Sequence, residues 1–187
     1  VWPALEREPH IHLHRWPVQL DLTGDNALVV EGEVESVAAK KRVLEIAGAA
    51  PGVRGVVDRL HVVPSEYKGD GEILDGLKAL LLDVRELNNC TLRVMKKGQA
   101  ITLREAGGED ASGDILAAVK DGVVTLDGWA ISLSHKRLAG VLAWWVPGCR
   151  DVVDGLEVSP PEQDNDDEVS DALSLVLEMD PMIPHPE

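Results

Sequence analysis

The chain repeats itself at an offset of 96 residues. When residues 28–64 are placed on residues 124–160 without a gap, 13 of the 37 positions are identical. The identical residues include glycine, proline, valine and leucine, which determine turns and apolar cores. A self-similarity of this length predicts that one structural unit is built at least twice in the chain.

Each copy begins with a pattern that is typical of a β-hairpin. Two short apolar segments flank a four-residue loop in the first copy, and they flank Asp121-Gly122, a strong two-residue turn signal, in the second. The predicted strand pairs are residues 18–22 with 27–31 and residues 115–119 with 123–126.

A helix and a last strand are predicted after each hairpin. Ser36 is a candidate N-cap for a helix over residues 37–49, and Ser132 or Ser134 has this role in the second copy. A Pro-Gly pair ends each helix, and a valine-rich alternating segment follows. With an amphipathic helix over residues 72–86 before the second hairpin, one unit is predicted as α-β-β-α-β. The fold class is therefore α+β, with two helices on one face of a three-stranded mixed sheet in each unit.

The repeat register also predicts the domain organisation. The first unit covers residues 1–64, with its first helix truncated, and the second covers residues 65–160, with an inserted hairpin and loop at 88–113. Residues 161–187 are predicted to be an acidic linker and the first helix of a partial third unit, and we expect the chain to be an excerpt of a longer protein. Three residues of the second unit's first helix recur at the same offset: Glu72, Asp75 and Leu77 meet Glu168, Asp171 and Leu173.

Two of the repeated motifs resemble the BON domain (bacterial OsmY and nodulation). One is the apolar-apolar-acid-Gly step at residues 29–32 and 125–128, and the other is the Pro-Gly-Val segment at 51–62, echoed at 147–158. The resemblance implies a non-enzymatic binding or scaffold module of the bacterial cell envelope or periplasm, in a stress-response context. Its expected partner is a phospholipid surface or a protein. It also implies an alternative, a homotypic assembly domain of an oligomeric ring, channel or sensor.

The charge distribution excludes some partners. The net charge is −15, and residues 161–187 carry nine acidic residues and no basic one. A nucleic-acid-binding protein is expected to present a basic face, so this role is disfavoured. No apolar run reaches the roughly 18 residues that a membrane span needs, so we expect no span in this segment.

Basic residues recur at one position of the second helix in both copies. Lys40, Lys41 and Arg42 fall in one helical turn, and Lys136 and Arg137 repeat the first two. They are candidate contacts for lipid headgroups or an acidic partner. The alternative is an ordinary solvated helix face.

Trp144 and Trp145 make the helix of the second copy apolar on two sides. At about 100° per residue, Trp145 lies in a second apolar stripe and Trp144 points almost opposite the first. A helix with two apolar sides is expected to have two partners. The second partner is the inserted hairpin, another unit or a separate protein, so both tryptophans are candidate binding residues.

His10, His12 and His14 alternate along the chain. On a strand, all three would project from one face, where imidazole nitrogens can bind zinc. This predicts a weaker alternative function, a metal-binding module. The competing interpretation is a polar strand face.

No catalytic motif is present in the sequence. The nucleophile-elbow, phosphate-loop and dinucleotide-binding patterns are missing, and neither Cys90 nor Cys149 has a nearby histidine in sequence. Cys149 aligns with Val53 on a predicted core strand, so a buried, inert thiol is expected. We therefore expect no enzymatic activity and no cofactor.

Overall fold

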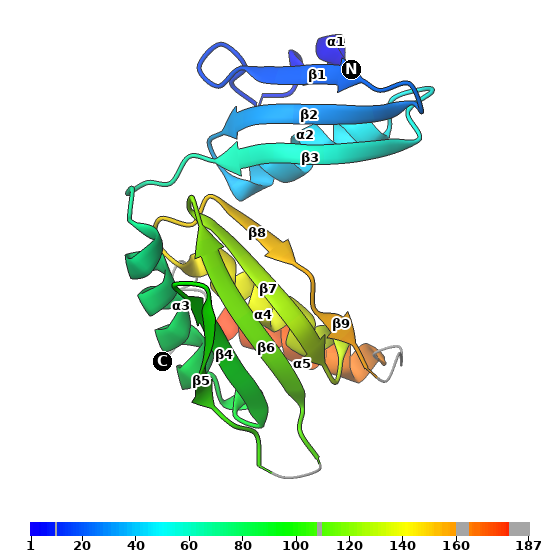
Figure 1. Ribbon diagram of the computed structural model, residues 1–187. Coiled ribbons are helices and arrows are strands. Elements are labelled where there is room, and N and C mark those ends of the chain that lie inside the picture. The colour runs from blue at the N-terminus through cyan, green and yellow to red at the C-terminus, as the bar shows by residue number, and fades with distance from the viewer. Residues whose placement is uncertain (10, 108–109, 160–164, 180–187) are drawn as a thin grey trace. The chain divides into compact units, whose positions relative to one another are not determined.

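The computed structural model describes residues 1–9, 11–107, 110–159 and 165–179. The chain divides into two compact units, Val1–Ser65 (unit 1) and Glu66–Glu187 (unit 2). Each unit has its own mixed sheet with helices against one face (Figure 1). The predicted α+β class is confirmed.

Unit 1 has the predicted α-β-β-α-β order. Its sheet runs β1-β2-β3, with β1 antiparallel and β3 parallel to β2, and α2 passes behind it in Figure 1. The hydroxyl oxygen of Ser36 accepts the N–H of Ala39, which confirms the predicted N-cap. The elements are α1 (Trp2–Leu5), β1 (Val18–Leu22), β2 (Ala27–Val34), α2 (Val37–Gly48) and β3 (Gly55–Val62).

Unit 2 repeats this order with additional strands. Its hydrogen-bonded strand path is β5-β4-β6-β7-β8, and β9 also pairs with β7. Ser132, the first of the two candidates, caps α4 by accepting the N–H of His135. The elements are α3 (Asp70–Asp83), the 3-10 helix η1 (Arg85–Leu87), β4 (Cys90–Lys96), β5 (Gln99–Arg104), β6 (Gly113–Lys120), β7 (Val123–Ala130), α4 (Leu133–Trp145), β8 (Asp151–Asp154), β9 (Glu157–Val158) and α5 (Asp166–Met179).

The inserted hairpin, β4 and β5, extends the sheet of unit 2. β4 pairs in parallel with β6, in a register that places Leu92 beside Ile115, and both side chains are buried. Alternate β4 residues therefore join the apolar core beneath α3. The sheet of unit 1 has the three strands expected. The sheet of unit 2 has six among the described residues, because the insertion adds β4 and β5 and the last strand is divided into β8 and β9.

The repeated Gly32 and Gly128 have positive φ, +143° and +117°. They lie inside β2 and β7, at positions that require glycine. The physical reason is the close approach of the neighbouring strand. A Cβ on Gly32 would come within 2.6 Å of the Pro17 carbonyl oxygen, and one on Gly128 would collide with that of Asp114.

Asp70 ties α3 to the β6–β7 turn. Gly69 is the N-cap of this helix, and Asp70 is the first helical residue. Its two carboxylate oxygens accept the N–H groups of Asp121 and Gly122 at 3.0 and 2.9 Å. The first helix of unit 2 is thus anchored at the hairpin turn.

We predict that Gly128→Ala destabilises unit 2 by at least about 2 kcal/mol, because it adds both a clash and an unfavourable φ. Urea denaturation followed by circular dichroism measures the change. Gly24→Ala is the matched control, since a Cβ there meets no atom within 4 Å. Equal effects of the two substitutions would contradict the assigned role of Gly128.

Candidate binding site

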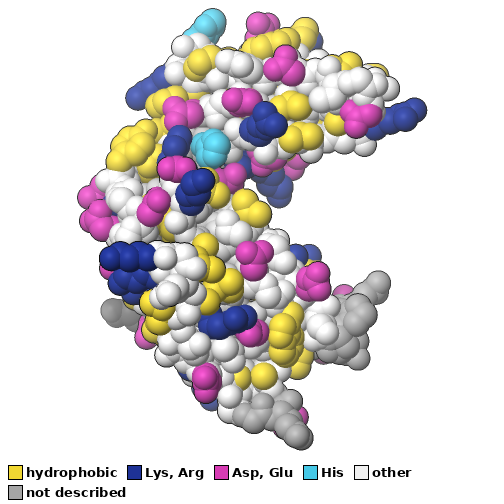
Figure 2. All heavy atoms as spheres, viewed as in Figure 1, with side chains coloured by type: hydrophobic (Ala, Val, Ile, Leu, Met, Phe, Trp, Pro, Cys, Tyr) yellow, Lys and Arg dark blue, Asp and Glu magenta, His cyan; other side chains and the backbone are white. Residues whose placement is uncertain are grey.

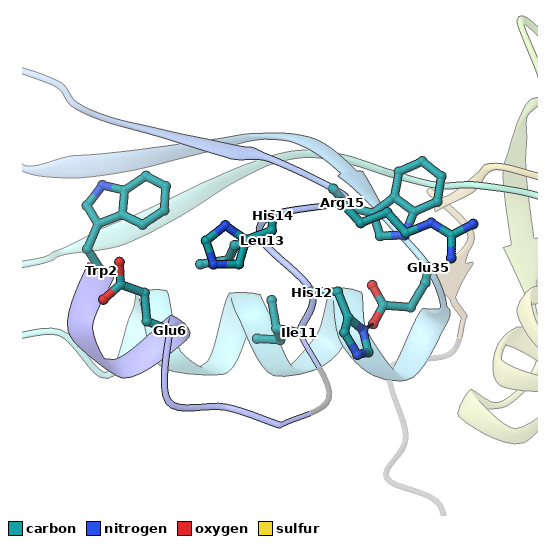
Figure 3. Close-up of a pocket in the computed structure, with 9 residues that line it drawn as sticks. Trp2, Glu6, Ile11, His12, Leu13, His14, Arg15 and Glu35 are labelled. Atoms are coloured by element: carbon teal, nitrogen blue, oxygen red, sulfur yellow. Dashed lines mark hydrogen bonds and ion pairs between the residues drawn. The ribbon is translucent and has the colours of Figure 1, made fainter.

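Unit 1 contains a cavity of about 820 Å³ between α1, the segment of residues 11–16 and the start of α2 (Figure 3). Its walls combine aromatic and aliphatic side chains with charged ones. Trp2 is 44% exposed, so part of the apolar wall is open to solvent. The lining residues are Trp2, Glu6, Ile11, His12, Leu13, His14, Arg15, Trp16 and Glu35.

Glu35 is the polar centre of this cavity. It follows β2 and precedes the N-cap of α2, so two secondary-structure elements hold its backbone. Its Oε1 lies 2.6 Å from Nδ1 of His12, while Oε2 is buried and has no hydrogen-bond partner among the described residues. A buried carboxylate oxygen that lacks a donor costs free energy, which a donor from a ligand would recover.

Arg15 lies near Glu35 in Figure 3, at the end of the cavity away from Trp2 and Glu6. The guanidinium carbon of Arg15 lies 5.3 Å from the centroid of the Trp16 ring, a cation–π distance. This contact restrains both side chains, so the aromatic wall is partly preorganised.

The histidines do not lie on a strand. The N–H groups of Arg15 and Trp16 both donate to the His12 carbonyl oxygen, so residues 12–16 form a turn. The predicted strand geometry for His12 and His14 is therefore wrong, because local backbone hydrogen bonds coil this segment. His10 lies outside the described residues. Within the described residues no group of three potential metal ligands occurs, and the metal-binding alternative stays a prediction.

The basic residues predicted as a cluster on α2 differ in burial: Lys40 is buried, whereas Lys41 and Arg42 are exposed. Lys40 is only 6% exposed, and its Nζ donates to the Leu60 carbonyl oxygen at 2.7 Å and pairs with Asp58 Oδ2 at 2.9 Å. Its charge is therefore used inside unit 1. Arg42 is exposed but binds Glu8 and Glu45, which raise the pKa of its guanidinium in that order. Lys41 is exposed.

The same positions behave differently in unit 2. Lys136 is half-buried and Arg137 is exposed. Burial raises the pKa of the Asp154 carboxyl, and the N–H of Leu156 and the charge of Lys136 oppose this only in part. A Cβ on Gly140 would come within 3.1 Å of Asp154 Oδ2, so the glycine leaves room for this carboxylate, whereas Leu44 stands at the matching position of unit 1.

Trp144 and Trp145 are both half-buried and pack against the core of unit 2. α4 contacts the sheet on one side and also contacts α3 and α5. Neighbouring helices of the same unit thus supply a second partner for this helix. The binding role of the two tryptophans stays a prediction.

Both cysteines are buried thiols. Burial raises the pKa of the Cys90 thiol to about 11, against a smaller opposite effect of Arg104. The reactive thiolate is therefore scarce at neutral pH.

Two segments of the chain, residues 17–64 and 100–160, match the model of the BON domain. The chain belongs to the BON-domain family. BON domains are in general non-enzymatic modules that bind phospholipid or protein. Sequence analysis thus identified the family correctly, while the cavity around Glu35 was missed because its lining residues meet only in the folded unit.

Solved structures of CdsD, a structural protein of the type III secretion system of Chlamydia trachomatis, also show similarity. One, of the C-terminal domain, has 13% sequence identity and a TM-score of 0.25, and covers 79% of this chain and 93% of the other. A second has the same identity and TM-score and covers 92% and 95%. None of the curated proteins matches this chain.

Among the helices of the described residues, none combines the length and the apolar character required to cross a membrane.

We predict that Lys40→Met destabilises unit 1 by about 1–3 kcal/mol, because the Leu60 carbonyl oxygen and Asp58 lose a charged donor. Amide hydrogen exchange of β3 measures the loss locally. Lys136→Met is the matched control in the other repeat and is expected to cost less than about 1 kcal/mol. A neutral result for Lys40→Met would contradict the internal role of this ammonium group.

We predict that Asp154 makes unit 2 less stable as pH rises. Its folded pKa is raised, so its contribution is fully present below the unfolded pKa and is lost as pH rises through the folded pKa. Asp154→Asn keeps an oxygen acceptor for the N–H of Leu156 and removes the charge. At neutral pH it should raise the melting temperature by about 2–4 °C, with no gain in acid. Thermal denaturation from about pH 3 to about pH 8 tests this.

Proposed function

We propose that this chain is a non-enzymatic binding module of the bacterial cell envelope that binds a segment of a partner protein through the unit 1 cavity. The observation that carries the proposal is the buried Oε2 of Glu35, which has no hydrogen-bond partner within the described part of the chain and lies in a cavity walled by Trp2 and Trp16. Such a cavity suits an apolar side chain next to a hydrogen-bond donor or a cation.

The charge arrangement favours a protein over an anionic lipid surface. Lys40 is withdrawn into the core, and Arg42 is held by two glutamates. On the face shown in Figure 2, basic side chains are scattered among acidic ones and form no continuous patch. Polybasic attraction to a membrane needs several clustered cations, and the chain carries a net charge of −15.

The cavity also defines the chemistry of the partner segment. Glu6 and Glu35 supply negative charge, and Ile11 and Leu13 supply apolar contact. A peptide with a lysine between apolar residues satisfies both, because its ammonium group reaches a carboxylate while its neighbours pack against the walls.

The test uses a capped Leu-Lys-Leu tripeptide as the probe, with binding followed by tryptophan fluorescence or calorimetry. We expect Glu35→Gln to weaken binding by about tenfold, because the peptide loses a charge-assisted hydrogen bond. Trp16→Ala should also weaken binding through lost apolar contact. Glu31→Gln, on the other face of the sheet, is the matched control and should bind like the unchanged protein.

Sedimentation with phosphatidylglycerol vesicles separates the two partner classes. We expect no co-sedimentation, and no effect of Arg137→Glu. Vesicle binding that is lost on Arg137→Glu but survives Glu35→Gln would overturn the proposal in favour of a lipid partner.

A further inference from the structure

α5 repeats α3 at the offset that relates the two units. Asp166 aligns with Asp70 at this offset, and both helices have 14 residues. In each helix, the apolar positions recur every four residues along one stripe. The stripe consists of Ile73, Leu77 and Leu81 in α3 and of Val169, Leu173 and Leu177 in α5.

The two stripes have opposite environments. In α3, the three side chains are 0%, 0% and 3% exposed, since they pack into the core between helix and sheet. In α5, they are 40%, 58% and 45% exposed. The face that α3 buries is thus the face that α5 leaves open to solvent. Exposed leucines in register on one helix face indicate a binding surface.

A different side of α5 holds it in unit 2. Val176 packs against the core of this unit, and α5 contacts α4. The contact between α5 and α4 therefore leaves the Val169, Leu173 and Leu177 stripe exposed. A helix that is apolar on two sides is expected to have a second partner.

The first residue of α5 is an aspartate, like the first residue of α3, which anchors α3 to its sheet. The Asp70 carboxylate accepts two N–H groups of a hairpin turn, and Asp166 stands at the same position with an exposed side chain. The carboxylate of Asp166 therefore matches a second hairpin turn, placed as the β6–β7 turn lies against α3.

We propose that α5 is the first helix of a third unit, and that the Val169, Leu173 and Leu177 stripe packs against the inner face of that unit's β-β-α-β layer. α5 then belongs to two units at once, with Val176 against α4 and the stripe beneath the third sheet. This inference is independent of the partner that unit 1 binds.

Charge argues against a second copy of α5 as the occupant. The sequence of α5 contains five acidic residues and no basic one, so two such helices repel each other. An apolar sheet face with free N–H groups at its hairpin turn has no such conflict.

The test supplies a layer and asks whether the stripe becomes buried. Residues 5–11 resemble residues 177–183, so residues 12–64 are joined directly after Ile183, which keeps the spacing between helix and layer. Leu173→Cys then reports burial through its rate of thiol labelling, because Cys90 and Cys149 are already buried. We expect labelling to slow by at least about tenfold in the extended chain.

Two further variants make the result specific. Asp167→Cys corresponds to the exposed Gly71 of α3, and its thiol should label at the same rate with and without the layer. Val169→Asp in the extended chain should restore fast labelling at position 173. Unchanged labelling at position 173, or an added layer that stays unfolded by circular dichroism, overturns the proposal. Self-association of the original chain that Leu173→Asp abolishes also overturns it, because the occupant is then a second copy.

Discussion

Burial of one apolar helix stripe against one face of a mixed sheet is the interaction on which unit 2 depends. Ile73, Leu77 and Leu81 bring α3 over β6, and the core between them also includes residues of β4, β7 and α4. Each fully buried side chain of this kind contributes about 2 kcal/mol. Asp70 then sets the position of the helix along the hairpin. The bare stripe of α5 follows from the same physics, because the helix repeats without a sheet beneath this face.

Identical residues of the repeat acquire different chemistry from their surroundings. Lys40 and Asp58 form a pair in which the lysine is buried, whereas Asp154 is half-buried with a raised pKa. The neighbouring residue matters, because Gly140 leaves space for a carboxylate where unit 1 has leucine. A repeated motif therefore indicates a repeated fold without implying a repeated binding site.

The proposed function depends on which groups the fold leaves unsatisfied. In unit 2, α3, a larger sheet and two half-buried tryptophans fill the core. In unit 1, the first helix, α1, has only four residues, and a cavity lies beside it. Glu35 lines that cavity, with one carboxylate oxygen bonded to His12 and the other lacking a donor among the residues that the structure describes. Polar groups of this kind, next to the apolar side chains of a cavity, orient a ligand.

The sequence by itself determined the features that local chemistry controls. The repeat predicted the order of elements, and the Asp-Gly pair predicted the hairpin turn. Ser36, and Ser132 or Ser134, indicated the helix starts, and two motifs indicated the family. Only the tertiary structure decided where long-range contacts place these residues. In the folded chain, Lys40 is buried in unit 1 and β4 pairs with β6. Gly128 lies within a strand, against a carbonyl group of the neighbouring strand. Burial and strand pairing join residues distant in sequence, so no local pattern encodes them.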